Sequence, residues 1–156
     1  MAVPPRGDTG HGTYFITAST FQKQSLFQSE KMAYLFIEVL FHYRQQEKYL
    51  LHEFVLMPDH FHLLITPAIT LERSLQFIKG GFSYRAKKKL GFGGEIWQTS
   101  FYDRRVRDVD EYQGFGKYIH SNPSKRGFRE YAYTSASSEF ELDAVPQRLN
   151  PISLIA

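Results

Sequence analysis

Two stretches with the residue pattern of β-strands, Tyr49–Met57 and residues 60–66, are separated in this chain only by Pro58 and Asp59. Proline and aspartate favour tight turns, and two strands joined by a two-residue turn pair antiparallel as a hairpin. The chain is therefore committed to a fold that contains an antiparallel sheet.

Other elements follow from equally local signals. Residues 13–20 are rich in β-forming side chains and show the alternating pattern of a strand, so they predict the first strand. Residues 96–101 predict a fourth strand, and residues 103–108 predict a charged connection after it. Three helices are predicted, each preceded by a side chain that can accept a hydrogen bond from its first turn: Ser29, Thr70 and Asp108. The third helix is expected to end near Asn122, because Pro123 disfavours a further turn.

The resulting order, βαββαβα, predicts a single ferredoxin-like α+β domain, with an antiparallel sheet and helices packed on one face. A chain of 156 residues has the usual size of one domain. We expect a flexible N-terminal arm at residues 1–12, the main domain at 13–128 and a C-terminal tail at 129–156. Because this fold hosts many activities, function has to be inferred from particular side chains.

His60 and His62 lie two residues apart on the second strand of the hairpin. Strand side chains alternate, so both imidazoles share one face with Leu64, while Phe61 and its apolar alternates occupy the other. The apolar face is expected under the helices, which leaves the histidines on the more open side. Two imidazoles on one face can bind one divalent metal ion, although a pair of ordinary strand histidines is the alternative.

Tyr118 and Asn122 are four residues apart on the third predicted helix, so they share a face of that helix. Any one of the ten tyrosines could equally be a packing residue. A phenol ordinarily titrates at about pH 10 and needs a nearby cation or base to act as a nucleophile. Together with the two histidines, these side chains are sufficient for metal-assisted attack of a tyrosine on a phosphodiester.

Composition narrows the possibilities further. The chain has no cysteine, which excludes disulfides, thiolate catalysis and sulfur-ligated metals. No apolar run approaches the length of a membrane span, so we expect a cytoplasmic, nucleoid-associated protein without a membrane partner. The net charge of +3 permits a polyanionic partner, and Trp97, Phe101 and Tyr102 could either stack on bases or pack in the core.

Nine cationic side chains are candidates for contact with phosphates. The first three end the second helix, where a solvated helix terminus is the alternative, and the others flank Tyr118. They are Arg85, Lys87, Lys88, Arg104, Arg105, Arg107, Lys117, Lys125 and Arg126.

The segments MPDHFHLLI, WQTSFYDRRVRD and YIHSNPSKRG occur in this order. With them the chain resembles the single-tyrosine HUH transposases, and in particular the REP-associated tyrosine transposases, over about residues 14–128. HUH denotes histidine, a hydrophobic residue and histidine, and Phe61 is the hydrophobic residue here. The resemblance implies a ferredoxin-like catalytic domain that binds single-stranded or hairpin DNA, as a monomer or a homodimer.

The same resemblance implies roles for particular residues. His60, His62 and Asn122 match the ligands of a divalent metal, expected to be Mg²⁺ or Mn²⁺. Tyr118 matches the nucleophile, which attacks a phosphodiester to give a 5′-phosphotyrosine and a free 3′-hydroxyl. Gly114, one helical turn before Tyr118, costs about 1 kcal/mol relative to alanine, and one interpretation is that it clears space for DNA.

Two other functions are compatible with these motifs. One is a domesticated, sequence-specific DNA-binding protein without productive turnover, which would not need all four proposed catalytic side chains. The other is a replication initiator or relaxase with the same chemistry, which the short chain disfavours.

Overall fold

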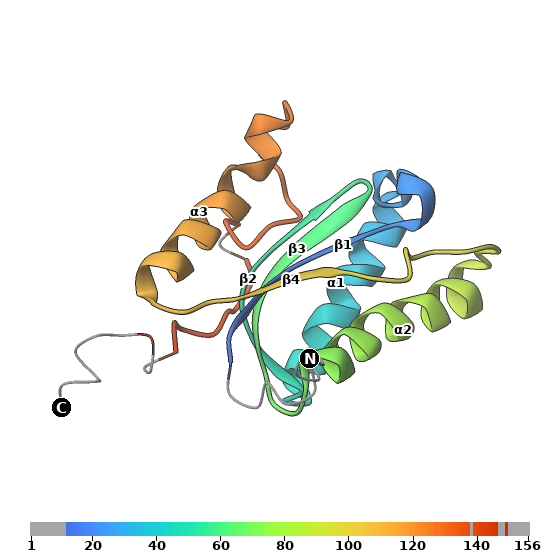
Figure 1. The fold of residues 1–156 in the computed structure, drawn as a ribbon. Coiled ribbons are helices and arrows are strands. Elements are labelled where there is room, and N and C mark those ends of the chain that lie inside the picture. The colour runs from blue at the N-terminus through green and yellow to red at the C-terminus, as the bar shows by residue number, and fades with distance from the viewer. Residues whose placement is uncertain (1–11, 138, 147–148, 150–156) are drawn as a thin grey trace.

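The computed structural model describes residues 12–137, 139–146 and 149. Within them one four-stranded antiparallel sheet has the order β2-β3-β1-β4 and is flanked by three α-helices (Figure 1). The strands are β1 (Tyr14–Ser19), β2 (Tyr49–Met57), β3 (His60–Pro67) and β4 (Tyr102–Arg105). The helices are α1 (Glu30–Gln45), α2 (Leu71–Leu90) and α3 (Val109–Lys125), with short 3-10 turns at Phe21–Lys23 and Leu26–Gln28. The predicted single-domain α+β fold is confirmed, and no described helix is long and apolar enough to span a membrane.

The helices begin where the sequence predicts. The side chains of Ser29, Thr70 and Asp108 each accept a hydrogen bond from the backbone N–H three residues later. The end of α3 differs from the prediction, because the helix continues beyond Pro123 to Lys125. The carbonyl oxygen of Pro123 accepts hydrogen bonds from the N–H groups of Arg126 and Phe128, which closes one further turn after the proline.

The two faces of the sheet are covered by different helices. Ile16 and Leu63 belong to the larger core, which α1 and α2 cover. Phe15 and Leu64 point the other way and pack with Ile119 of α3. The expectation that the helices lie on one face is therefore correct for α1 and α2 and wrong for α3, which crosses the opposite face (Figure 1). An apolar stripe on α3 stabilises this position by burial.

The fourth strand lies later in the chain than predicted. Residues 96–101 contribute only an isolated bridge between Trp97 and Thr20, whereas Tyr102–Arg105 pairs with β1. Charged residues suit this position, because β4 is an edge strand and charge at an edge prevents pairing with other chains. Most residues of β4 are therefore charged, as in a loop between elements, although the β4 backbone pairs within the sheet.

A β-bulge at His52 changes the alternation of β2. Leu51 is paired with Ile65 and Glu53 with Leu64, so His52 is the extra residue. The side chain of His52 is buried, with Nδ1 3.0 Å from the Asp143 carbonyl oxygen and Nε2 2.8 Å from the hydroxyl of Thr66. Beyond the bulge, Glu53 lies on the same face of the sheet as the two histidines of β3.

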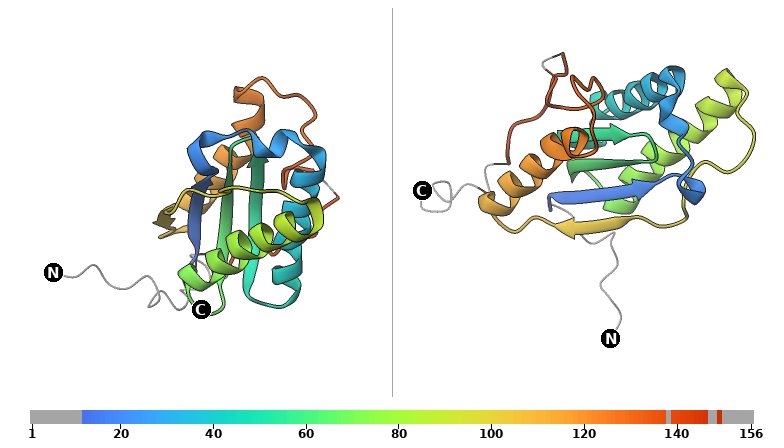
Figure 2. Two further views of the ribbon diagram at one scale, coloured as in Figure 1. Left: turned by 90° about the vertical axis from the view of Figure 1, so that its right-hand side faces the viewer. Right: turned by 90° about the horizontal axis from the view of Figure 1, so that it is seen from above.

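The described part of the C-terminal tail lies along the outer edge of β2 (Figure 2). Backbone hydrogen bonds join Leu56 to Tyr133, Ser135 to Phe54 and Asp143 to Leu51. The Asp143 carboxylate also accepts two hydrogen bonds from Arg44 of α1, at 2.9 and 3.0 Å, and one from the Leu51 N–H at 2.8 Å. The tail thereby covers an edge that would otherwise expose unpaired backbone groups.

Removing the Asp143 carboxylate should destabilise this docking. Burial alone would raise the pKa of Asp143, but the hydrogen bonds from Arg44 and Leu51 give a net lowering. The stabilisation is then complete above about pH 3.9, the ordinary value, and is lost as pH falls through the lower folded-state pKa. We expect Asp143→Ala to reduce the free energy of unfolding by about 1–3 kcal/mol near neutrality, measured by urea denaturation.

The difference between the wild type and Asp143→Ala should shrink as pH falls below about 4. Glu139→Ala, which removes an exposed carboxylate of the same tail, is the matched control and should leave stability nearly unchanged. A pH-independent difference would show that the Asp143 carboxylate is not the stabilising group.

Candidate active site

His60 and His62 are placed side by side on the central strand β3, with ring centroids 4.8 Å apart. Both are buried, with 5% and 4% of their surface exposed, so the expectation that they lie on an open side is wrong. The reason is α3, which covers this face. The Nδ1 atom of each ring has a hydrogen-bond partner. Nδ1 of His60 is 2.7 Å from the Asp59 carboxylate, and Nδ1 of His62 is 2.8 Å from the Thr17 hydroxyl.

These partners determine which imidazole nitrogen is available. The pKa of Asp59 is lowered, because the hydrogen bond with His60 and nearby positive charges outweigh the effect of burial. An ionised carboxylate can only accept, so Nδ1 of His60 carries the proton and Nε2 presents a lone pair. A carboxylate or hydroxyl behind Nδ1 is the usual support of a metal-binding histidine.

Two buried polar atoms lack a hydrogen-bond partner among the described residues: Nε2 of His62 and Oδ1 of Asn122. An unpaired buried polar atom costs about 1–3 kcal/mol, so each of these two atoms requires an explanation. Two imidazole nitrogens and one amide oxygen fit a divalent ion that completes its coordination with other oxygens. No group of three or more histidine, cysteine or acidic side chains suited to a metal occurs in the described part of the chain.

Contacts of the residues on either side of Asn122 indicate that this part of α3 lies over the imidazole pair. The ring of Tyr118 meets the ring of His62 edge-on, with centroids 5.2 Å apart. The charge of Arg126 lowers the pKa of both histidines. Tyr118 and Asn122 are four residues apart on one face of α3, and Arg126 is the residue directly after the helix. Asn122, between the other two, is 6% exposed, whereas Tyr118 is 43% exposed. One face of α3 thus presents an amide to the interior and a phenol at the solvent boundary.

The histidines are uncharged in this environment. Burial is the largest cause that lowers the pKa of His62, to about 3, and the nearby His60 and Arg126 further disfavour a charge on its ring. Burial also lowers the pKa of His60, more than the carboxylate of Asp59 raises it. An imidazole must be neutral to bind a metal ion, and both rings are neutral near pH 7.

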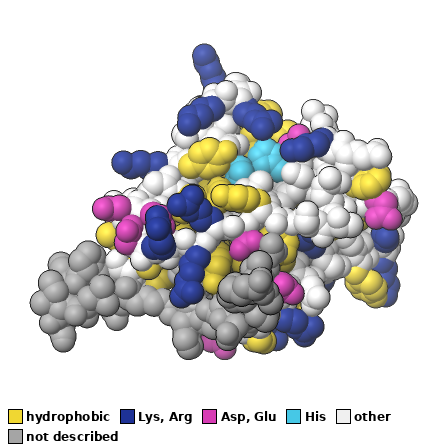
Figure 3. Space-filling view, in the orientation of Figure 1, with side chains coloured by type: hydrophobic (Ala, Val, Ile, Leu, Met, Phe, Trp, Pro, Cys, Tyr) yellow, Lys and Arg dark blue, Asp and Glu magenta, His cyan; other side chains and the backbone are white. Residues whose placement is uncertain are grey.

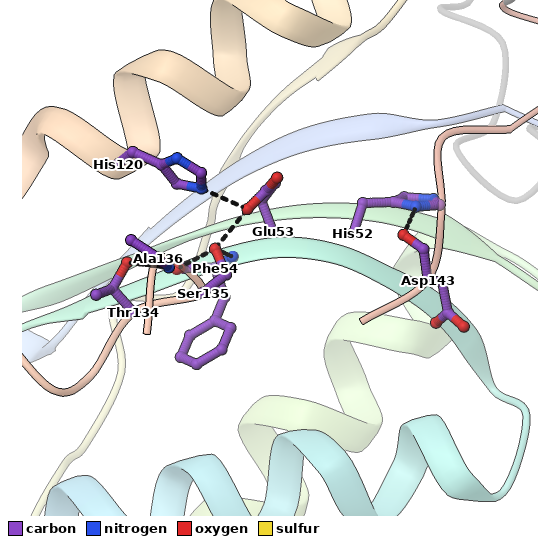
Figure 4. Close-up of polar contacts among 8 residues, drawn as sticks. All are labelled: His52, Glu53, Phe54, His120, Thr134, Ser135, Ala136 and Asp143. Carbon is purple, nitrogen blue, oxygen red and sulfur yellow. Dashed lines mark hydrogen bonds and ion pairs between the residues drawn. The ribbon is translucent and has the colours of Figure 1, made fainter. Parts of the chain in front are cut away.

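His120, on the same helix, joins α3 to β2 and to the tail. Its Nε2 is 2.7 Å from Oε1 of Glu53, which also accepts a hydrogen bond from the Ser135 hydroxyl at 2.6 Å (Figure 4). Ser135 in turn accepts a hydrogen bond from the N–H of Phe54. We expect this cluster of Glu53, His120 and Ser135 to restrain the rotation of α3 about its axis, and with it the direction in which Tyr118 points.

Substitution of His120 tests this positioning role. We expect His120→Ala to reduce the free energy of unfolding by about 0.5–1.5 kcal/mol and to accelerate amide hydrogen exchange in α3 more than in α1. His120→Gln retains a side-chain N–H donor and should restore part of the protection. His42→Ala, which removes a histidine of α1 next to Gln46, is the control; equal acceleration of exchange in α3 by both alanine variants would contradict the role.

The nine candidate cations are not gathered in one place. Lys125 lies close to the phenol, with Nζ 5.8 Å from the centre of the Tyr118 ring, and Arg126 lies near the histidines. Arg104 is opposite Phe15 in the sheet, on the histidine side. Arg107 is paired with Glu111, at 2.6 Å, and Glu111 is also 3.6 Å from Arg104. Figure 3 shows Lys and Arg side chains around a surface patch of histidine and hydrophobic groups.

The remaining candidates lie elsewhere. Lys117 is an exposed residue of α3, and Arg105 alternates to the face opposite Arg104. The other three are at the end of α2, on the far side of the sheet: Arg85, Lys87 and Lys88.

Several supporting residues could not be identified from the sequence. Thr17 reaches His62 only because β1 pairs with β3, and the pair of Glu53 and His120 depends on the bulge in β2. For Asp59, directly before His60, the sequence predicts a place in the turn. Its position next to a candidate ligand is the one local signal that could have revealed its second role.

Comparison with protein families identifies the class to which this fold and site belong. Residues 10–122 match the family described as Transposase IS200 like. Because this match covers well over half of the chain, the protein belongs to that transposase family.

The similar proteins point to one branch of such enzymes. A REP-associated tyrosine transposase from Escherichia coli (strain K12) is 26% identical over 147 residues, which cover 90% of this chain and 83% of the relative. The structure of a REP-associated tyrosine transposase bound to a REP hairpin has a TM-score of 0.71 at 19% identity, covering 94% of this chain and 92% of that one. A protein of Deinococcus radiodurans R1 regarded as a transposase has a TM-score of 0.52 at 22% identity, over 77% of this chain and 97% of that one. The resemblance to REP-associated tyrosine transposases is confirmed.

Proposed function

We propose that this transposase is a metal-dependent single-strand DNA endonuclease and strand-transferase, and that Tyr118 is its nucleophile. The observation that carries the proposal is the pair of unpartnered buried atoms, Nε2 of His62 and Oδ1 of Asn122, beside an exposed phenol. A structural role alone would leave both atoms uncompensated, whereas a cation compensates both. The substrate we propose is single-stranded DNA next to a hairpin, as the hairpin-bound relative suggests.

His60, His62 and Asn122 would bind the ion, for which we propose Mg²⁺ or Mn²⁺. When bound, such an ion polarises a phosphodiester and aligns it for attack. Asp59 and Thr17 orient the imidazoles through their Nδ1 atoms. The burial that keeps both imidazoles uncharged also makes them available as ligands without proton loss.

The chemical step transfers the phosphate from DNA to the protein. The Tyr118 oxygen forms a bond to phosphorus while the bond between phosphorus and the 3′ oxygen breaks, which leaves a 5′-phosphotyrosine and a 3′-hydroxyl. Because Tyr118 is 43% exposed, water can accept the phenolic proton, and the departing 3′ oxygen takes up a proton. Attack by another 3′-hydroxyl reverses the step and joins strands, so no nucleotide cofactor is consumed.

The positive charge around the site favours the same reaction. Lys125 and Arg126 end α3 beside the phenol and the histidines, and we propose that they contact the DNA backbone on either side of the cleaved bond. Arg104, on the same face, extends this charge along β4. Phosphate contacts of this kind bind without sequence preference and weaken with added salt.

The nucleophile can be tested by trapping the covalent intermediate. Tyr118→Phe removes only the hydroxyl and keeps the ring against Phe15 and His62. With hairpin DNA and Mg²⁺ or Mn²⁺, we expect the wild type to form a protein–DNA adduct on denaturing gels and the variant to form none while still binding DNA. Tyr34→Phe, at an exposed tyrosine of α1, should behave as the wild type.

Two outcomes would change the assignment. An adduct that persists in Tyr118→Phe would move the nucleophile to another residue. Binding without any adduct, with either metal and with many hairpins, would favour a domesticated DNA-binding protein.

Metal binding can be measured without DNA. We expect Mn²⁺ titration followed by electron paramagnetic resonance to show one site that is lost in His62→Ala and Asn122→Ala. Asp59→Asn, which alters only the support of His60, should weaken Mn²⁺ about 10- to 100-fold. Equal Mn²⁺ affinity in these variants and in the control His42→Ala would place the ion elsewhere.

A further inference from the structure

A hollow of about 390 Å³ lies on the histidine side of the sheet, outside the arrangement of histidines, amide and phenol. The end of β1, the turn after it and the segment that leads into β4 form its walls. Its lining residues are Thr17, Ser19, Lys23, Gln98, Ser100, Phe101 and Tyr102.

The hollow shares a wall with the proposed metal site. Thr17 lines it, and the hydroxyl of Thr17 is 2.8 Å from Nδ1 of His62. Ser19, also in the wall, is directly opposite His60 in the sheet. A DNA strand whose phosphate lies at the two imidazoles therefore has an adjoining nucleotide within reach of this hollow.

Tyr102 offers the flat surface that a base requires. It is 56% exposed and is paired with Thr17 in the sheet, so its side chain lies on the histidine side. The other two aromatic candidates are occupied: Trp97 packs against Phe61 in the core, and Phe101 lies against the same core under Lys79. Stacking on an exposed aromatic ring is the common mode by which proteins bind single-stranded bases.

Gln98 supplies a polar group with a fixed backbone. Its N–H donates to the Ser19 carbonyl at 3.0 Å, and its own carbonyl accepts from Nζ of Lys79 at 2.9 Å. The side-chain Oε1 accepts only a long hydrogen bond, 3.4 Å, from the N–H of Gln22, and no described residue accepts from the amide nitrogen. An amide with donor and acceptor capacity can pair with the edge of a base.

The turn beside the hollow is strained. Gln22 and Lys23 have φ values of +52° and +58°, a left-handed conformation that is uncommon for residues other than glycine. The hydroxyl of Thr20 stabilises the turn, with bonds to the carbonyl oxygens of Gln24 at 2.7 Å and Asp59 at 3.1 Å. Strain of this kind often occurs at functional sites, and here it accompanies a lysine, Lys23, that lines the hollow.

We propose that this hollow binds one nucleotide adjoining the cleaved phosphodiester, with its base stacked on Tyr102 and its edge contacted by Gln98. Lys23 neutralises a phosphate of the same nucleotide. The inference rests on the proposed single-strand DNA function and adds a site that selects which sequence is cleaved. A larger hollow of about 610 Å³, between α2 and residues 99–101, lies across the sheet from the histidines and does not compete for this nucleotide.

A binding experiment in a Tyr118→Phe background tests the site without requiring cleavage. The probe is the tightest-binding DNA hairpin from a pool with randomised single-stranded flanks, and each flanking nucleotide is replaced in turn by an abasic one. We expect Tyr102→Ala to weaken binding about 5- to 150-fold, as loss of one stacked base does. At one flanking position the abasic substitution should then cause no further loss, because both changes remove the same contact.

Matched variants complete the design. Tyr102→Phe should bind DNA as tightly as the Tyr118→Phe protein that carries no further change. Gln98→Ala should reduce discrimination between bases only at the flanking position where the abasic nucleotide and Tyr102→Ala are not additive. Tyr34→Ala, at an exposed tyrosine of α1, should leave DNA affinity unchanged.

Strictly additive losses at every flanking position, or unchanged affinity in Tyr102→Ala, would overturn the nucleotide site. A wild type that binds the hairpin without forming an adduct would instead overturn the proposed cleavage function, while the abasic series still decides the role of the hollow. A pool without any binder would overturn both.

Discussion

The central strand β3 is buried on both faces, and the chemical state of the candidate active site depends on this. Its two histidines lie under α3 rather than in solvent, so both are uncharged and both need partners for their nitrogen atoms. Asp59 and Thr17 occupy one nitrogen of each ring and leave the other to a ligand. If this side of the sheet were open, water would solvate the imidazoles, and either nitrogen of each ring could then bind a ligand.

The helix α3 combines a buried and an exposed function on one face. Ile119 anchors it in the small core, and the cluster of Glu53, His120 and Ser135 links it to β2 and to the tail. In this position of the helix, Asn122 is buried while Tyr118 remains accessible to a substrate. A Cβ at Gly114 would meet no atom of the described protein, so packing does not require glycine there. The open space on this helix face agrees with the interpretation that DNA approaches it.

Local signals predicted most of the fold and the main candidates of the site. The hairpin, the three helix caps and the alternation of β3 depend on residues close in sequence, and each has a direct physical reading. The errors came from long-range effects. The bulge at His52, the edge strand Tyr102–Arg105 and the covering of the histidine face by α3 are all decided by packing partners distant in the chain. For the same reason Thr17 and Glu53 could not be recognised as supports of the site.

The distribution of charge separates the cations proposed to contact DNA into two groups. Lys23, Lys125 and Arg126 lie close to the imidazoles or the phenol, and electrostatic interactions at such distances persist at physiological salt. The cations that end α2 lie across the sheet, so they contribute little to the field at the cleaved phosphate. If they bind DNA, they must contact a different part of it, such as a duplex stem. In the proposed reaction, charge near α3 and β1 would therefore act on the chemistry at the strand, whereas charge on α2 would only add affinity for the rest of the substrate.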